Sequence, residues 1–236
     1  MRSVALLALA CGVLSACADA ETMTGPDQEF PVAEASKGPA LGSGGDYEIT
    51  VENLTTAGGQ WFTPPLVALH QRAEDFFTVG KPASDRLMQL AENGGVPGFA
   101  ESLGSSHHVS SSAVLFGAGG ALAPGESATL SLSAEPGSNF VSFASMLICT
   151  NDGFTGVDGA KLPNRLGEVM EFFVGAYDAG TEMNTEDFAD LVPPCQEVGG
   201  VSSGDDGTGM SNPALAEHGV IHPHPGILGG EDLVPG

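Results

Sequence analysis

Short segments in which apolar and polar residues alternate recur along this chain, and they constrain its fold more than any other feature. Tyr47, Ile49 and Val51 alternate with polar residues, which is the period-two pattern of a strand with one buried face. The predicted strands cover residues 47–52, 128–133, 140–148 and 169–177, with a weaker one at 219–222. Because turn-forming residues separate these segments, the chain is predicted to be mainly β, an antiparallel β-sandwich with one or two short helices.

One helix is predicted after Ser84, a residue type that often caps helix N-termini. Its apolar face would carry Leu87, Leu90 and Ala91. The glycines at 94–95 would end this helix, and a second helical turn is predicted over residues 98–103. Residues 61–69 are also apolar, but two prolines interrupt them, so a packed loop or edge segment is expected there.

Residues 1–16 have the layout of an export signal. Arg2 precedes an apolar run that extends to Leu14, and this run is too short for a spanning helix, which needs about 20 apolar residues. Two small residues and then Cys17 follow, which is the order of a lipoprotein acylation site. The alternative is cleavage after Ala20, at the Ala-Asp-Ala site, with release of the chain.

Composition sets the expected boundaries in the rest of the chain. Residues 17–45 are polar and rich in Gly, Ala and Pro, so they predict a flexible tether. Ordered structure is expected to begin at Asp46, with one domain over residues 46–230. Within that domain, residues 197–218 are dominated by Gly, Ser and Asp and predict a loop.

The chain is strongly acidic, with 30 Asp and Glu against 7 Lys and Arg and a formal net charge of −23 at pH 7. Such a surface repels nucleic acid and anionic lipid head groups. We therefore expect no nucleic-acid partner, and contact with a membrane only through a lipid anchor. The charge suits divalent cations or basic partners, although solubility outside the cell also explains it.

Two cysteines remain once Cys11 is removed with the signal segment and Cys17 carries a lipid. In an oxidising compartment two remaining cysteines usually pair, so a disulfide between Cys149 and Cys195 is predicted. The alternative is a pair of buried free thiols.

Two predicted strands run into turns that carry acidic residues. Asp152 follows the strand at 140–148, while Asp178 and Glu182 lie four residues apart across the turn after the strand at 169–177. Carboxylate and carbonyl oxygens from two loops at one end of a sandwich can together bind Ca²⁺, which prefers oxygen ligands. Spacing alone leaves open that these acids are simply solvated.

The two acidic loops belong to a longer set of motifs, found at residues 47–55, 62–65, 145–146, 150–154 and 177–182. Together they resemble the bacterial branch of the spondin N-terminal domain family over most of residues 46–230. The resemblance implies a sandwich similar to membrane-binding C2 domains, with a calcium site at Asp152, Asp178 and Glu182. Matrix spondins carry Asp at the last of these positions, so Glu182 keeps the charge on a longer side chain.

The resemblance also concerns the end of the chain. Bacterial members continue past a His-Pro-Gly-Ile stretch, here residues 224–227, and an Asp-Leu pair, here 232–233, into a closing strand. This sequence reaches Gly236 directly after those residues. The expectation is that either a strand is missing or a sheet edge is left open.

Candidate catalytic motifs are weak. Residues 200–204 fit G-x-S-x-G, but a nucleophile elbow needs a strand before the serine and a helix after it. The histidines at 107–108, His222 and His224 lack a third metal ligand at a useful spacing, so solvated side chains are expected. The chain is therefore not expected to be an enzyme.

These features together predict an exported, lipid-anchored, calcium-binding domain for adhesion or binding at the cell surface. Its partner would be a protein or a glycan. The expected location is the outer membrane or cell surface, with secretion or a periplasmic location as the alternative. The rival functions are a secreted hydrolase that uses the acidic loops, or a structural surface protein without a bound ion.

Overall fold

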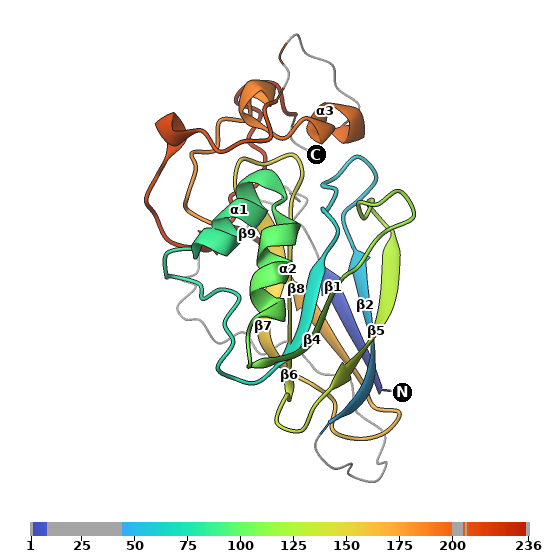
Figure 1. Cartoon of the computed structure of the whole chain (residues 1–236). Coiled ribbons are helices and arrows are strands. Elements are labelled where there is room, and N and C mark those ends of the chain that lie inside the picture. Colours follow the sequence, from blue (N-terminus) through green and yellow to red (C-terminus); the bar gives the residue numbers. More distant parts are fainter. Residues whose placement is uncertain (1, 9–43, 200–204, 206, 235–236) are drawn as a thin grey trace, which may run out of the picture.

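The computed structural model describes residues 2–8, 44–199, 205 and 207–234, and it is mainly β, as the sequence predicts (Figure 1). A four-stranded sheet has the order β5-β2-β1-β8, and a six-stranded sheet has the order β10-β9-β7-β6-β3-β4. The strands are β1 (Arg2–Ala8), β2 (Gly45–Asn53), β3 (Leu66–His70), β4 (Val109–Val114), β5 (Ser127–Ala134), β6 (Phe140–Met146), β7 (Gly153–Lys161), β8 (Val169–Val174), β9 (Ala176–Asp178) and β10 (His222–Pro223). Except where β1 takes part, paired strands within the sheets are antiparallel.

The alternation in β2 places its apolar residues between the two sheets. Tyr47, Ile49 and Val51 are buried, whereas the residues between them are only partly covered. They pack in an apolar layer that includes Val67 of β3 and Phe143 of β6. Burial of these side chains is the main favourable term that joins the two sheets.

The segment at 61–69 corrects one expectation, because Leu66–His70 is an interior strand rather than a loop or edge. All five residues of β3 are buried. Val67 and Leu69 lie in the layer between the sheets, while Leu66 and Ala68 belong to a second apolar cluster on the other face. The prolines end just before the strand, so they remove no hydrogen bond from its ladder.

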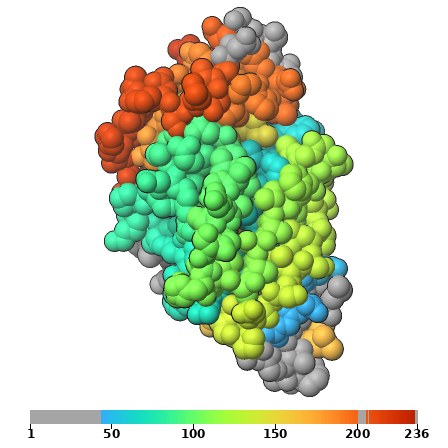
Figure 2. All heavy atoms as spheres, viewed as in Figure 1, coloured from blue at the N-terminus to red at the C-terminus, as the bar shows by residue number. Residues whose placement is uncertain are grey.

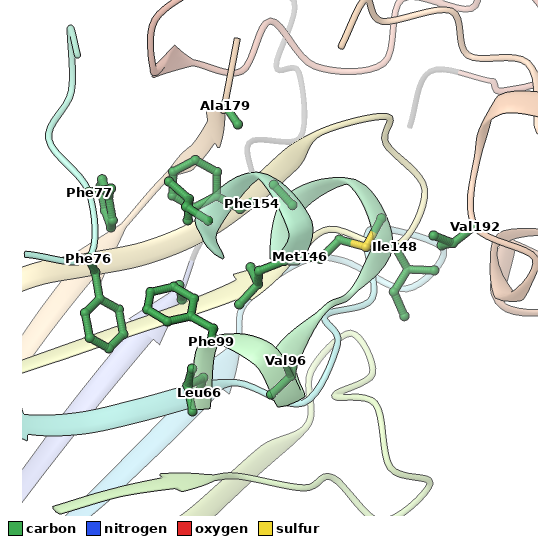
Figure 3. Packing of buried hydrophobic residues seen from close by; sticks show 14 of the residues in the cluster. Leu66, Phe76, Phe77, Val96, Phe99, Met146, Ile148, Phe154, Ala179 and Val192 are labelled. Atoms are coloured by element: carbon green, nitrogen blue, oxygen red, sulfur yellow. The ribbon is translucent and has the colours of Figure 1, made fainter. Parts of the chain in front are cut away.

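The second cluster is covered by the helices α1 (Asp85–Asn93) and α2 (Val96–Gly104), which lie against the outer face of the six-stranded sheet (Figure 1). Ser84 caps α1 by accepting from the Leu87 amide at 3.4 Å, and Gly94 ends it with a φ of 63°, as the sequence predicts. The rings of Phe76 and Phe99 pack with centroids 4.9 Å apart inside this cluster (Figure 3).

The strand predicted over 169–177 is divided between the two sheets. β8 pairs with β1 in the four-stranded sheet, whereas β9 pairs with β7 in the six-stranded sheet. Gly175 lies between them, and the change of sheet leaves Asp178 at the end of β9. The strands β4 and β7 were not predicted. β7 begins directly after Asp152, so the first acidic loop is shorter than the sequence suggested.

Residues 2–8, which the sequence assigns to the signal segment, form β1 in this structure. β1 lies between β2 and β8 and is parallel to both, with Val4 opposite Ile49 and Met170. Cys17, the tether expected at 17–45 up to residue 43, and the cleavage site after Ala20 lie outside the described residues. The signal segment itself stays a prediction.

The C-terminal part of the chain caps one end of the molecule, where orange and red atoms lie beyond the two helices (Figure 2). Its short elements are η1 (Phe188–Asp190), α3 (Pro194–Gly199) and η2 (Pro213–Leu215). Ile221 and Leu233 are buried in the cluster beneath the helices. The buried carboxylate of Glu186 accepts from the amides of residues 228–230 and so fixes the chain near its end. Among the described helices, none combines the length and the apolar character needed to cross a bilayer.

Candidate functional site

Asp152 joins the two acidic loops at the capped end of the sandwich. Its Oδ2 accepts from the backbone amide of Thr181 at 2.7 Å and from that of Glu182 at 3.0 Å. Its backbone carbonyl accepts from the Ala179 amide at 3.2 Å. The carboxylate is fully buried, and its other oxygen, Oδ1, has no hydrogen-bond partner. A buried acceptor without a hydrogen-bond partner lowers the stability of the fold. A bound cation or a hydrogen-bond donor at Oδ1 would remove this cost.

Asp178 is held by the turn that follows β9. Its Oδ1 accepts from the Gly180 amide at 2.8 Å, and its Oδ2 accepts from the Asn184 side chain at 2.6 Å. Gly180 has a φ of +68°, and a Cβ there would lie 2.6 Å from the backbone of Val220. Only glycine therefore fits this turn. His222 of β10 approaches Asp178 Oδ1 at 3.6 Å.

Glu182 is buried from the other side by the C-terminal segment. Its Oε1 accepts from the Asn212 amide at 2.7 Å. Burial raises the pKa of Glu182 to about 7; the Asn212 hydrogen bond opposes the rise, and the carboxylates of Glu92, Asp152 and Asp190 add to it. Like charges in a poorly solvated place disfavour one another's ionised forms.

The pKa of Asp152 is also raised, to about 6, by burial first and by the neighbouring Asp178 carboxylate second. The amides of Thr181 and Glu182 act in the opposite direction. Among the described residues, no Lys or Arg forms an ion pair with the three predicted acids. The site therefore gathers negative charge, and the basic side chain that approaches it is the imidazole of His222 beside Asp178.

A second acidic group lies nearby and was not predicted. Among the described residues, the carboxylates of Asp187, Asp205 and Asp232 each offer an oxygen within 4.8 Å of the other two. The three predicted acids, Asp152, Asp178 and Glu182, do not meet this criterion. Asp187 and Asp232 already accept from the amides at the start of η1. Capping and solvation account for these partly exposed acids.

The predicted disulfide is confirmed. Cys149 and Cys195 are bonded with an S–S distance of 2.22 Å and a Cα–Cα distance of 5.0 Å. The bond connects the loop after β6 to α3, and both cysteines are buried. All three predicted acids lie within the loop of chain that the disulfide closes.

Of the histidines at 107, 108, 222 and 224, two differ from the expectation of solvated side chains. His222 is exposed, but Nε2 of His224 is buried without a partner, and burial lowers the pKa of His224. His107 is exposed, whereas Nδ1 of His108 is buried without a partner. The ring centroids of this pair lie 3.9 Å apart, and neither ring belongs to a group of potential metal ligands among the described residues. The G-x-S-x-G motif at 200–204 lies outside the described residues.

Two contributors to the site could not be found from sequence patterns. Asn212 reaches Glu182 from the segment predicted as a Gly- and Asp-rich loop. Glu92 comes from the last turn of α1, where its spacing indicates only an ordinary amphipathic helix. Both residues lie far along the chain from the acids they approach, so only the tertiary structure shows that they belong to the site.

Two sheets, a disulfide and buried acids at one end define a disulfide-stabilised β-sandwich with an acidic end. A family model of the spondin N-terminal domain, Spondin_N, matches residues 55–189, and the chain belongs to this family. No curated protein matches the chain. The family and the disulfide fit an extracellular or secreted binding or adhesion domain.

Proposed function

We propose that this protein is an exported calcium-binding domain that binds a protein or glycan at the cell surface. Asp152, Asp178 and Glu182 would hold the ion, which would neutralise their charge and fix the two loops relative to one another. The observation that carries the proposal is the buried Asp152 Oδ1, which has no hydrogen-bond partner and lies beside the Asp178 carboxylate, while no Lys or Arg among the described residues forms an ion pair with the three acids. Hard oxygen ligands of this kind suit Ca²⁺.

Thermal melting of the purified chain with calcium and with chelator tests the site. For extracellular sites with Kd values of about 10⁻⁴–10⁻³ M, 10 mM calcium stabilises by about 1.4–2.7 kcal/mol. For a domain of this size, that corresponds to a rise in the midpoint of about 3–11 °C. Magnesium should give a much smaller rise, because it loses its water less readily.

Matched variants locate the ion. Asp152→Asn and Asp178→Asn should each abolish the calcium-dependent shift, whereas Asp187→Asn, in the other acidic trio, should retain it. If the wild-type midpoint is the same in calcium and chelator, or if Asp152→Asn keeps the shift, the proposed site is wrong. A shift lost only in Asp187→Asn would place the ion at the second trio.

Lipid anchoring is a separate part of the proposal. Labelled fatty acid should be incorporated into the chain in its host and should be lost in Cys17→Ser. A mature chain that begins at Glu21, without lipid, would instead support secretion after cleavage at Ala20.

The hydrolase alternative draws on one specific observation, the raised pKa of Glu182 beside a cavity. A carboxylate that is protonated near neutral pH can serve as a general acid. Carboxylates clustered at an empty cation site also have raised pKa values, so the response to calcium discriminates between the hydrolase and the calcium-binding proposals. Under the calcium proposal, saturating calcium releases protons at pH 7, which a calorimetric titration in buffers of different ionisation enthalpy detects.

A further inference from the structure

A cavity of about 460 Å³ lies between α1, the turn after β9 and the C-terminal segment. Glu92 and Glu182 both line it, and the Glu92 carboxylate is close enough to raise the pKa of Glu182. Much of the remaining wall comes from apolar side chains, namely Pro82, Ala83, Met88, Pro213 and Ala216. The cavity therefore combines negative charge with walls that are rich in carbon.

Glu92 is the unusual member of this lining. The residue is only 7 % exposed, and its Oε2 is buried without a hydrogen-bond partner. It lies one helical turn after Met88 on α1, so both side chains face the same space. Nothing in the described fold supplies a donor to this atom, and an isolated buried carboxylate is costly to folding.

The surrounding walls are held in place without a ligand. The Asn93 side chain donates to Ser211 Oγ at 2.9 Å, and the Asn212 amide donates to Glu182 at 2.7 Å. The Asn212 side chain also donates to Asp190 at 3.2 Å. A cavity whose walls are already fixed loses little entropy when it binds a ligand.

We propose that this cavity binds an aliphatic primary ammonium group, as presented by a lysine side chain of a protein partner. The ammonium would pair with the Glu92 carboxylate, while the methylene stem would lie along Met88 and the proline walls. Ca²⁺ or Mg²⁺ suits the cavity less, because each requires about six or more oxygen ligands and much of the wall is carbon. The net charge of −23 would further favour a basic partner over an acidic one.

This inference deepens the proposed function, because it names the chemistry of the partner, but it does not require bound calcium. Only Glu182 is common to the two sites. Binding is therefore measured first in chelator, so that a failed calcium site and a failed ammonium site are distinguishable.

The test is a calorimetric titration of the purified full chain with Nα-acetyl-lysine methylamide. The neutral probe Nα,Nε-diacetyl-lysine methylamide has the same stem and serves as the ligand control. The charged probe should bind at least tenfold more tightly than the neutral one. Equal binding of both probes, or no binding of the charged probe, would overturn the proposal.

Variants distinguish the cavity from the general acidity of the surface. Glu92→Gln should weaken binding of the charged probe at least tenfold and should also raise the melting temperature of the unliganded chain, because it removes a buried unpaired charge. Glu101→Gln, which removes an exposed acid from α2, should leave binding unchanged. Asp152→Asn should lose the calcium shift but keep probe binding within about threefold. Retained binding in Glu92→Gln would contradict the assignment.

Discussion

The disulfide gives the prediction with the best-defined magnitude. Cys149 and Cys195 are 46 residues apart, and closing a loop of that length removes denatured-state entropy equivalent to about 4 kcal/mol at 25 °C. Replacing both cysteines by alanine avoids a new buried hydroxyl at either position. The double variant should lose about 4 kcal/mol of unfolding free energy, with a midpoint about 8–16 °C lower.

Urea unfolding of the wild type, the double variant and the reduced wild type measures this loss. The reduced wild type controls for the packing of the two buried sulfurs, so both perturbed forms should lose similar free energy. Calcium stabilisation should weaken in both, because Asp152, Asp178 and Glu182 lie inside the closed loop. A loss below about 1 kcal/mol in both forms would refute the loop-entropy argument.

Two further predictions concern buried polar groups. Glu74 accepts from Ser106 at 2.7 Å and from Arg86 at 2.8 Å. Burial alone would raise the pKa of Glu74, but these donors prevail and lower it. Glu74→Gln should therefore cost about 1–3 kcal/mol at pH 7, and the difference from wild type should vanish as pH falls through the lowered pKa in acid unfolding curves. Asn53 is fully buried and donates to the carbonyls of residues 60 and 122 at 2.8 and 3.0 Å, so Asn53→Ala should cost about 2–4 kcal/mol in urea unfolding. A cost within 0.5 kcal/mol of zero would show that water replaces the side chain.

The strands that the sequence predicts are those with one buried face. β2 and β5 alternate because one side of the four-stranded sheet is covered and the other is exposed or partly exposed. β3 has no such signal, since Val67 and Leu69 face one apolar cluster while Leu66 and Ala68 face the other. A strand that is buried on both faces gives only a short apolar run, which periodicity cannot distinguish from a packed loop.

The division of 169–177 shows a second limit of local patterns. In the sequence, β8 and β9 form one run of strand-forming residues. The chain changes sheet at Gly175 because β8 pairs with β1 and β9 pairs with β7, and local sequence does not show these partners. The serine-rich β4 is partly buried along its whole length, so its sequence carries little apolar contrast. Both features depend on tertiary partners.

The site divides in the same way. Asp152, Asp178 and Glu182 were predicted because they lie where predicted strands give way to turns and because they match the calcium positions that the family resemblance implies. Their surroundings were not found, because Glu92 and Asn212 come from distant segments whose own patterns indicate a helix face and a loop. The orphan oxygens of Asp152 and Glu92 exist only once these segments have packed together.

The place of residues 2–8 connects the fold to the proposed export. An apolar segment suits both a signal sequence and an interior strand, because the hydrophobic effect favours burial of either kind. The two placements exclude one another. Without β1, β2 and β8 would lie about 10 Å apart, twice the usual spacing between strands, with unpaired backbone groups facing the gap. Ile49 and Val51 pack beside this gap. If residues 1–16 are removed as the predicted leader, the four-stranded sheet must therefore change: either β2 and β8 close together, or other residues pair in the position of β1.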